Sequence, residues 1–316
     1  MPTYYVDSAG SNTAPYDTWA KAAQDPNTIE AVPIAAGDTV YARGTFTGTW
    51  TWAVSGTSLL SAGAITWIGC AADGTPYGGQ FVVDRAAGGN QPVDCAAKTH
   101  RITHNVTATN GNFEGFNSMG FSSVFSQCIA EANGRYGFEN AGAGTSHFYN
   151  CISRNNAYGF YNVDTSLFAA CYAYNNSSYG FYVATGTKLI HCGAYDNDTD
   201  NIIVTSTNCA IVSCFAHSSS GGSGIHVTDF DGYCSIMGCA LTNNNQYGIE
   251  VDAGNVNVYE DYNGFLNNGV ADRTNCPTGR HSGTFAADPY VNSGAGNFST
   301  SDTASFRRTE IDMEFA

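Results

Sequence analysis

Five side chains in the last third of the chain could carry out acid–base chemistry. Hydrolysis of a glycosidic bond uses two carboxyl groups about 5–9.5 Å apart, one as the acid and one as the base or nucleophile. A histidine beside a carboxylate is another common acid–base arrangement. The candidates for a catalytic site are His226, Asp229, Asp231, Glu250 and Asp252. The alternative is that these are solvated turn residues and a surface contact between a histidine and a glutamate.

Such residues can act together only if the fold brings them together, and a cysteine repeat indicates which fold that is. Six cysteines follow one another at intervals of 23, 20, 21, 22 and 25 residues. A small or apolar residue stands two positions after each of them, and an apolar position, usually after glycine, stands nine to eleven residues after it. The six are Cys128, Cys151, Cys171, Cys192, Cys214 and Cys239. Leucine-rich repeats have a similar period, but the chain lacks their leucine framework, so the repeat predicts a parallel β-helix.

Each repeat unit is expected to form one coil of three short strands. Apolar residues alternate with period two in YGFYV and YGIEV, which is typical of strands, and Asn-rich turns such as YNNSS separate them. Coils would stack at about 4.8 Å, so that equivalent residues form columns. The six cysteines then form a structural ladder of small apolar side chains in an interior corner. No metal site is predicted there, because each cysteine lies on a different coil and C-x₂-C spacings are absent.

The repeat resembles that of the right-handed parallel β-helix proteins of the pectate-lyase-like superfamily. Their common repeat is roughly N-x-I-x-x-N-x-x-x-G-I-x-L, and this chain places cysteine in the asparagine ladder of that repeat. The segment TYYVDSAGSNTAPYDTWAKAAQ is similar to the opening strand and capping helix of the family, in which Trp19, Ala20 and Ala23 would cover the first coil. The segment ADPYVNSGAGNFSTSD resembles the family's closing segment.

The resemblance implies an all-β chain that forms one single-stranded, right-handed parallel β-helix. Residues 1–35 would be the N-terminal cap with its helix, residues 36–270 the solenoid, and residues 271–316 a capping tail over the last coil. Caps are expected because the open ends of a solenoid would template other strands.

The resemblance leaves the activity open, because this fold carries lyases, hydrolases, isomerases and viral fibres. A lyase of this kind needs an arginine or lysine base beside a calcium-binding carboxylate cluster. The column expected to face the substrate groove contains neither, and consists of Glu139, Tyr161, Tyr182, Ile203, His226 and Glu250. Glu139 and Glu250 would lie five coils apart, roughly 24 Å, which is too far for a catalytic pair. No cofactor is therefore expected, and calcium only if the chain is a lyase.

Aromatic residues predict contact surfaces on the outside of the rod. A strip on the strand after each cysteine is expected to be covered by a neighbouring chain or a second copy. This strip consists of Tyr172, Tyr174, Tyr195, Phe215 and His217. Tyr161 and Tyr182 face the expected groove instead, where their rings could contact a glycan. The alternative is that these are scattered surface aromatics.

Charge and the opening residues bear on partners and location. The net charge is −15, and only 12 residues are lysine or arginine. Nucleic acid and membranes are therefore not expected as partners, because a phosphate surface needs clustered basic side chains. The opening MPTYYVDSAG lacks the basic and apolar regions of a signal peptide, which predicts a protein made in the cytoplasm. The whole chain has 11 cysteines, and this odd number favours free thiols.

Two functions fit these observations. The first is a structural or adhesive component of a virus particle, such as a capsid decoration, spike or fibre. It would contact protein partners in an assembly or homo-oligomer, or a surface polysaccharide, through an aromatic face, and it would end in the virion. The second is a polysaccharide lyase or glycoside hydrolase that degrades a surface polysaccharide. The absence of a complete catalytic set in the sequence favours the first.

Overall fold

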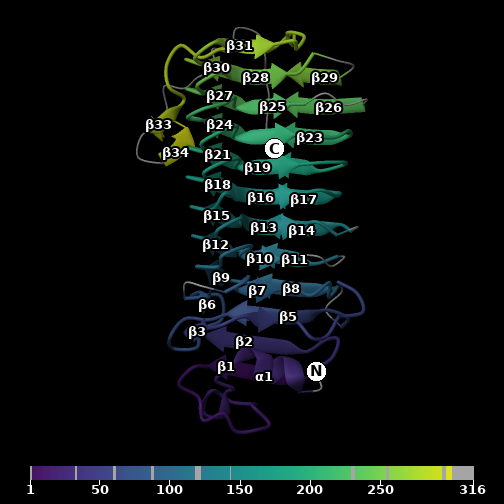
Figure 1. Cartoon of the computed structure of the whole chain (residues 1–316), viewed down its shortest axis with the longest axis vertical. Helices are drawn as coiled ribbons and strands as arrows, with labels where there is room; N and C mark the ends of the chain where they lie inside the picture. The colour runs from purple at the N-terminus through teal and green to yellow at the C-terminus, as the bar shows by residue number, and fades with distance from the viewer. Residues whose placement is uncertain are drawn as a thin grey trace.

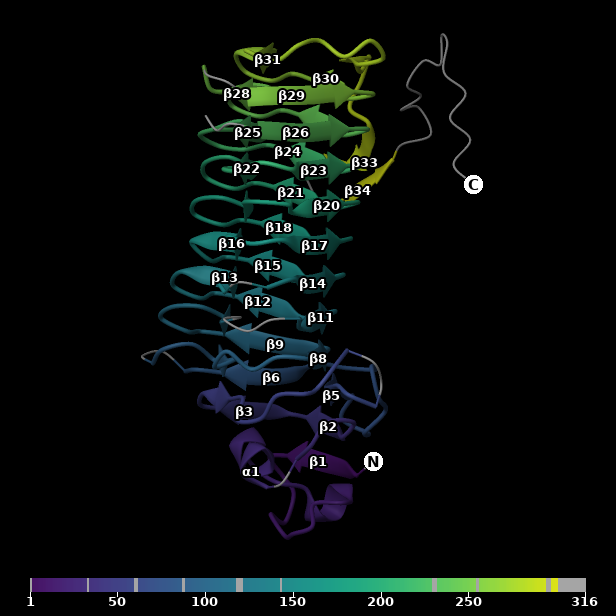
Figure 2. The same cartoon turned by 90° about the vertical axis from the view of Figure 1, so that its right-hand side faces the viewer.

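The chain winds into a rod of three parallel sheets, here named A, B and C (Figures 1 and 2). The computed structural model describes residues 2–32, 34–59, 62–86, 89–117, 122–142, 144–228, 232–253, 256–293 and 297–300. From β2 onward, each coil contributes one strand to sheet A, then one to sheet B and one to sheet C. The all-β parallel solenoid predicted from the repeat is confirmed.

The strands are short, and each pairs in parallel with its equivalents in the coils before and after it. Sheet A consists of β1 (Thr3–Asp7), β2 (Thr39–Arg43), β5 (Ile65–Gly69), β8 (Arg101–His104), β11 (Val124–Ser126), β14 (Ser146–Tyr149), β17 (Ser166–Ala169), β20 (Lys188–Ile190), β23 (Cys209–Val212), β26 (Gly232–Met237) and β29 (Val256–Asp261). Sheet B consists of β3 (Thr45–Thr47), β6 (Phe81–Asp84), β9 (Val106–Thr109), β12 (Ile129–Glu131), β15 (Ile152–Arg154), β18 (Tyr172–Tyr174), β21 (Gly193–Tyr195), β24 (Phe215–His217), β27 (Ala240–Thr242), β30 (Gly264–Leu266) and β32 (Gly283–Thr284). Sheet C consists of β4 (Trp50–Thr51), β7 (Val93–Asp94), β10 (Phe116–Asn117), β13 (Tyr136–Asn140), β16 (Tyr158–Asn162), β19 (Phe181–Val183), β22 (Ile202–Val204), β25 (Ile225–Val227), β28 (Tyr247–Val251) and β31 (Ala271–Thr274).

Stacked aromatic rings fill the interior of the middle coils. The ring of Phe160 lies between those of Phe138 and Phe181, at centroid distances of 4.8 Å on each side. In sheet A, Phe148 and Phe168 stack in the same way at 4.6 Å. Because parallel strands in register place equivalent side chains one strand spacing apart, a sequence repeat becomes a continuous core. This core holds the outer side chains of each sheet at fixed positions.

The six repeat cysteines form a buried column at the corner between sheets A and B. The residue before each has a positive φ that turns the chain, as at Gln127 (55°). Five of the thiols donate to a carbonyl of the preceding coil, as Cys171 does to Phe148 at 3.4 Å. Asn263 continues the column, and its Nδ2 donates to the Ile236 carbonyl at 2.8 Å in the same way. Cysteine therefore takes the place of asparagine in this ladder.

A second ladder, made of asparagine itself, lies in the turn after sheet B. Asn156 Oδ1 accepts from the Asn133 backbone at 2.9 Å, and Asn176 Oδ1 accepts from the Asn156 backbone at 3.1 Å. The residue before the ladder position has a positive φ, as at Asn155 (56°) and Asn175 (53°). This explains the paired asparagines of the repeat: the first adopts the left-handed conformation that asparagine tolerates, and the second binds the neighbouring coil.

A short helix, α1 (Pro26–Ala31), closes the N-terminal end of the rod (Figure 2). Glu30 on this helix is buried, and both of its oxygens receive the guanidinium of buried Arg101 on β8. Trp50 Nε1 also donates to Glu30 at 3.2 Å. Trp19, in the 3₁₀ helix η1 (Trp19–Lys21), is half-buried, and Ala20 is exposed. Ala23, the third residue expected to cover the first coil, is fully buried in the core beside Val6, so the cap combines this part of the predicted segment with α1.

The C-terminal end differs from the capping tail expected after residue 270. Strands β31 and β32 extend sheets C and B, so the solenoid continues to Thr284. Residues 275–282 cross the last coil, where the Gly279 backbone donates to Glu260 at 2.7 Å. An antiparallel hairpin of β33 (Tyr290–Asn292) and β34 (Asn297–Thr300) then lies beside β21 and β24, along the side of the rod (Figures 1 and 2).

Within the described residues, the helices are too short and too polar to cross a membrane.

Candidate functional site

The outer face of sheet C carries two columns of side chains. The first consists of the outward residue next to the inward-facing phenylalanine or isoleucine of each strand. Its members are Asn117, Glu139, Tyr161, Tyr182, Ile203, His226, Glu250 and Thr274. The second column stands three residues earlier in each coil. Its members are Glu114, Tyr136, Tyr158, Tyr179, Asp200, Ser223 and Tyr247.

A glycine lies between these two columns in most coils, as in the recurring Tyr-Gly-Phe. A Cβ on Gly137 would lie 1.9 Å from Ser153 Oγ, and one on Gly159 would lie 2.3 Å from the Gly180 carbonyl. Only glycine therefore fits at these two positions, where the backbone approaches the neighbouring elements. The glycine allows the residue before it to lie on the outer face beside the first column, as Tyr136 does.

Five tyrosines from three adjacent coils meet on this face, and we call them the tyrosine cluster. Its members are Tyr136, Tyr158, Tyr161, Tyr179 and Tyr182. The Tyr161 ring stacks between Tyr136, at 4.2 Å, and Tyr182, at 4.7 Å. The Tyr158 ring stands across this stack, at 73° to Tyr136 and 82° to Tyr161. The stack therefore presents ring edges and hydroxyl groups, and the Tyr158 ring lies nearly perpendicular to it.

The hydroxyl groups at one side of the cluster are available to a ligand. Tyr158, Tyr179 and Tyr182 are half-buried. Among the described residues, no protein group forms a hydrogen bond with their hydroxyls, in contrast to Tyr174 on sheet B, whose hydroxyl accepts from Arg154 at 2.9 Å. Each free phenol can donate one hydrogen bond and accept others. The cluster thus combines apolar area with unsatisfied polar groups.

Two glutamates border the cluster on its N-terminal side. Glu114 is buried and accepts from Arg135 Nη1 at 3.4 Å, while the Arg135 guanidinium lies 4.3 Å from the centre of the Tyr136 ring. Glu139 is only 7% exposed. Burial, and then the nearby charge of Glu114, raise the pKa of Glu139 to about 7, although Arg135 opposes the shift. This end of the face therefore holds one carboxylate paired with an arginine and one carboxyl group that titrates near neutrality.

On the C-terminal side, His226 is clamped between two carboxylates. Its Nδ1 lies 3.0 Å from Asp200 Oδ2, and its Nε2 lies 3.2 Å from Asp252 Oδ1. Burial alone would lower the pKa of His226, but Asp200, Asp252 and Glu250 outweigh it and raise that pKa to about 9. Glu250 accepts from Ser223 Oγ at 2.6 Å. At neutral pH, His226 is an imidazolium with both nitrogens engaged, so it is not poised to act as a general base.

The sequence candidates of this region are thus only partly brought together. His226 and Asp252 are in contact, and Glu250 is the strand neighbour of His226. Asp229 and Asp231 lie outside the described residues. Glu139 and Glu250 are separated by four intervening members of the same column, in agreement with the prediction that they cannot form a pair.

A calcium ion does not fit this cluster as it stands. The ligand atoms of Asp200, His226 and Glu250 lie within 4.8 Å of one another. Calcium, however, takes six to eight oxygen ligands. Here Asp200 receives the Ser223 backbone at 2.7 Å on one oxygen and His226 on the other, and Glu250 receives Ser223 Oγ. His226 also offers a nitrogen and not an oxygen, so these residues do not provide the oxygen ligands of a calcium site.

Comparisons with known proteins bear on the fold. No family model matches the sequence, and no curated protein matches it. The structure is similar to the crystal structure of pectate lyase Pel9A, with a TM-score of 0.68 and 16% sequence identity over 100% of this chain and 94% of that one. It is also similar to ORF18 of Geobacillus virus E2, with a TM-score of 0.50 and 13% identity over 90% of this chain and 60% of that one. This chain has the right-handed, pectate-lyase-like parallel β-helix fold.

Within this pectate-lyase-like β-helix, the strip predicted as a protein contact face lies on the outer side of sheet B. Tyr174 and Tyr195 stack at 4.7 Å, and Tyr172 is 38% exposed. Phe215 and His217 are instead contacted by Tyr290 of the C-terminal hairpin, each at a centroid distance of 5.7 Å. The strip was expected to be covered by another chain. At its C-terminal end, this chain's own tail covers it.

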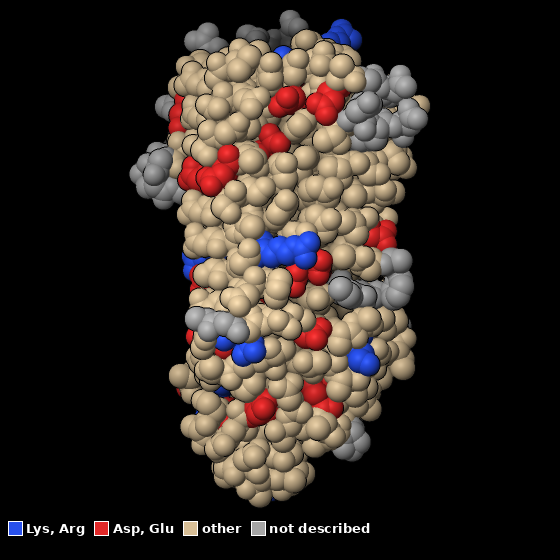
Figure 3. Space-filling model, viewed as in Figure 1, with Lys and Arg blue, Asp and Glu red and all other residues tan. Residues whose placement is uncertain are grey.

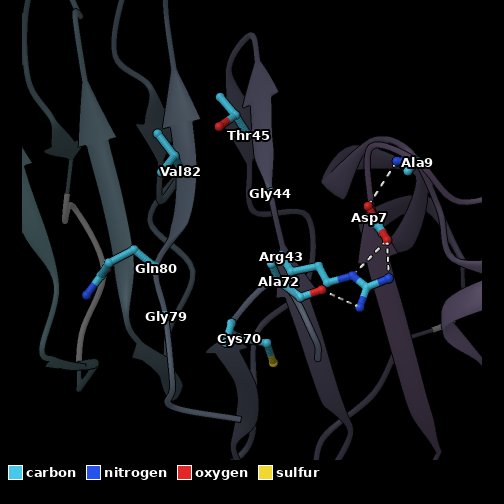
Figure 4. A pocket seen from close by; sticks show the side chains of 11 residues that line it. Asp7, Ala9, Arg43, Gly44, Thr45, Cys70, Ala72, Gly79, Gln80 and Val82 are labelled. Atoms are coloured by element: carbon cyan, nitrogen blue, oxygen red, sulfur yellow. Dashed lines mark hydrogen bonds and ion pairs between the residues drawn. The ribbon is translucent and has the colours of Figure 1, made fainter. Parts of the chain in front are cut away.

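The β-helix also has a hollow of about 430 Å³ near its N-terminal end (Figure 4). Arg43 lines this hollow, and its guanidinium binds Asp7 at 2.7 Å and the Ala72 carbonyl at 2.9 Å. Cys70 also lines the hollow, and burial raises the pKa of its thiol to about 11. Because its charged groups bind each other and its thiol stays protonated, the hollow has the character of a structural contact. We place the candidate site on sheet C.

The sequence did not identify all of the sheet C site. Tyr161 and Tyr182 were predicted to face a glycan, whereas Tyr136, Tyr158 and Tyr179 were not named. The signal that could have found these three is the recurring Tyr-Gly-Phe, in which glycine interrupts the alternation of inward and outward residues. Asp200 was not among the candidates either, although it stands at the same position of its coil as Tyr179 and contacts His226 of the next coil.

Proposed function

We propose that this protein binds a polysaccharide on the outer face of sheet C, as a rigid adhesive rod. The observation that carries the proposal is the tyrosine cluster with its free hydroxyl groups. Tyrosine supplies a large amphipathic contact area with few rotatable bonds, which keeps the entropy lost on binding low. The parallel coils hold these rings in place before a ligand arrives, so little ordering is needed.

The arrangement of the rings suits a chain of sugar hydroxyls. In the stack, Tyr136 is buried, and the half-buried Tyr161 and Tyr182 show their ring edges, which carry the positive side of the ring quadrupole. The crosswise Tyr158 adds a ring of different orientation. Phenol groups can both donate to and accept from sugar hydroxyls. Contacts repeated over adjacent coils would give a ligand several weak subsites along the rod, which raises the overall affinity by multivalency.

Substitutions at the cluster test this proposal against matched controls. The Tyr179→Phe and Tyr182→Phe variants remove one free hydroxyl each and keep the ring. A lost hydrogen bond of about 1 kcal/mol should weaken binding roughly fivefold. The control is Tyr233→Phe on sheet A, whose side chain is 68% exposed. Binding is measured by affinity electrophoresis in gels that contain single polysaccharides. The absence of binding to any polymer, or equal losses in all three variants, would contradict the proposal.

A second function, hydrolysis of the bound polysaccharide, is favoured by Glu114 and Glu139. Glu139, a buried carboxyl group whose pKa is raised to about 7, lies beside Glu114, which is paired with Arg135, and glycoside hydrolysis uses two such carboxyl groups in different environments. Release of reducing ends by the wild type and its loss in Glu139→Gln would support this function. Binding without release of reducing ends, or of the unsaturated ends that a lyase would form, supports the adhesive function.

We further propose that the rod works in a virus particle, as a decoration, spike or fibre. The similarity in fold to a protein of Geobacillus virus E2 is compatible with this setting. Protein contacts would use the part of the sheet B strip that the tail does not contact, around Tyr172 and Tyr174. Immunogold labelling of purified particles with an antibody against this chain is the test, and unlabelled particles would contradict this setting.

A further inference from the structure

We propose that the polysaccharide recognised by the tyrosine cluster carries no carboxylate or sulfate groups. This inference rests on the proposed function and specifies the chemical class of its ligand. It starts from the charges that surround the tyrosine cluster on sheet C. Figure 3 shows this side of the rod as mostly uncharged, with acidic groups scattered along its length and fewer basic ones.

The strands of the site supply acidic groups but no cation, and in the loops beside them Arg135 stands directly before β13. No lysine or arginine occurs in β13, β16, β19, β22, β25 or β28. These strands and the loops before and after them do contain Glu139, Asp200, Glu250 and Asp252. An acidic sugar that lies along this face would therefore meet carboxylates at both ends of the tyrosine cluster.

The cations nearest to the cluster all contact carboxylates of the protein. Arg135 contacts Glu114 at 3.4 Å and lies over the Tyr136 ring, and its side chain is 53% exposed. The His226 imidazolium lies between Asp200 and Asp252, with Glu250 as its strand neighbour, so three carboxylates surround one positive charge. Arg273 on β31 is the strand partner of inward-facing Ile249, and its guanidinium binds buried Glu260 at 2.5 Å. His226 and Arg273 could bind a sugar carboxylate only by giving up a carboxylate partner. Arg135 is therefore the one exposed cation beside the cluster among the described residues, and it faces the two carboxyl groups of Glu114 and Glu139.

The energy of the mismatch is large enough to discriminate between ligands. Two like charges in contact repel each other severalfold more strongly near a protein surface than in bulk water, because the effective dielectric constant is lower there. A neutral sugar meets no such repulsion, and its hydroxyls can donate to the same carboxylates. An amino sugar would be attracted to them. The charge pattern thus selects against acidic polymers and accepts neutral or basic ones.

Affinity electrophoresis with polymers of different charge tests the inference. The probes are galactomannan, dextran and chitosan oligomers on one side, and polygalacturonate and alginate on the other, each in EDTA and in calcium chloride. We expect at least one polymer of the first group to bind, and neither uronate to bind in either buffer. Tighter binding of a uronate, with or without calcium, would overturn the inference but leave the proposed function intact. No binding to any polymer would overturn both.

A charge variant provides an independent arm of the test. Glu250→Gln removes one carboxylate beside the site, and Asp17→Asn removes an exposed one in the N-terminal segment, far from sheet C. Both variants change the net charge equally. If repulsion at the site excludes uronates, Glu250→Gln should raise the affinity for polygalacturonate severalfold at low salt, and Asp17→Asn should not. An unchanged affinity in Glu250→Gln, or an equal rise in both, would contradict the inference.

Discussion

The rings of Tyr136 and Tyr161 lie face to face, with centroids 4.2 Å apart and planes at 10°. They belong to adjacent coils of sheet C. Tyr161 is the strand partner of Glu139, and Glu139 stands three residues after Tyr136 in the sequence. Their contact is therefore fixed by strand register, which the stacked phenylalanines of the interior maintain. The tyrosine cluster is thus a rigid consequence of the repeat.

The N-terminal cap should depend on the buried pair of Glu30 and Arg101. Glu30→Ala leaves the Arg101 charge buried without a partner, so we expect a loss of about 3–5 kcal/mol in the free energy of unfolding. The double variant Glu30→Leu/Arg101→Met should recover most of that loss, because neither charge remains. Urea denaturation followed by tryptophan fluorescence measures both. Equal destabilisation in the single and the double variant would show that the helix needs the pair for another reason.

The cysteine ladder should tolerate a small residue but not a charge. Cys171→Ala removes one thiol and should destabilise by about 1 kcal/mol, whereas Cys171→Asp buries an unpaired carboxylate and should cost several kcal/mol. All 11 cysteines are free, so titration after denaturation without reductant should find nearly all of them. In the native protein they should react slowly, since ten are buried and burial raises the pKa of Cys128, Cys171 and Cys214. Recovery of only a few thiols after denaturation would contradict this account.

The buried carboxyl group of Glu139 predicts a pH dependence of stability. Its pKa is raised from 4.5 to about 7 in the folded protein, so the folded state holds the proton more tightly than the unfolded state. The contribution of this carboxyl group to the free energy of unfolding is therefore most favourable below pH 4.5 and is lost as the pH rises to about 7. Allowing for solvent screening, Glu139→Gln should gain about 1–2 kcal/mol relative to the wild type between pH 4.5 and 8. A difference between the two proteins that stays constant with pH would contradict the raised pKa.

The C-terminal hairpin should be held to sheet B by Tyr290. This residue is 6% exposed and packs on Phe215 and His217, so Tyr290→Ala should weaken the attachment by about 3 kcal/mol. Proteolysis near residues 286–289 should then become on the order of 100-fold faster. Tyr259→Ala, at a position 58% exposed on sheet A, is the control and should leave the cleavage rate unchanged. Equal cleavage of wild type and Tyr290→Ala would show that other contacts hold the hairpin.

The repeat allowed most of the fold to be predicted, because a parallel solenoid converts sequence period directly into spatial register. The offsets around Cys151 and Cys171 were enough to place Tyr161 beside Tyr182. The same logic correctly separated Glu139 from Glu250. Such inferences need only the strand period and the spacing between coils.

The features that were not predicted depend on contacts that do not recur from one coil to the next. The attachment of Tyr290 to Phe215 joins residues 75 positions apart in the sequence through a tail that has left the repeat. The partner of His226 was not predicted either, because the repeat places Asp200 in the same column as Tyr179 but does not determine which side chain of a neighbouring coil His226 contacts. The outward position of Tyr158 was missed because glycine breaks the two-residue alternation at that corner.

Hydroxyl-radical footprinting of the protein with and without its tightest-binding polysaccharide tests the central claim most directly. The method reports the solvent access of individual tyrosine side chains. The account predicts that Tyr158, Tyr179 and Tyr182 are protected from oxidation by the bound polymer, while Tyr172, Tyr233 and Tyr259 are oxidised as in the free protein. Protection of Tyr172 on sheet B, or of Tyr233 and Tyr259 on sheet A, without protection of the tyrosine cluster would contradict it.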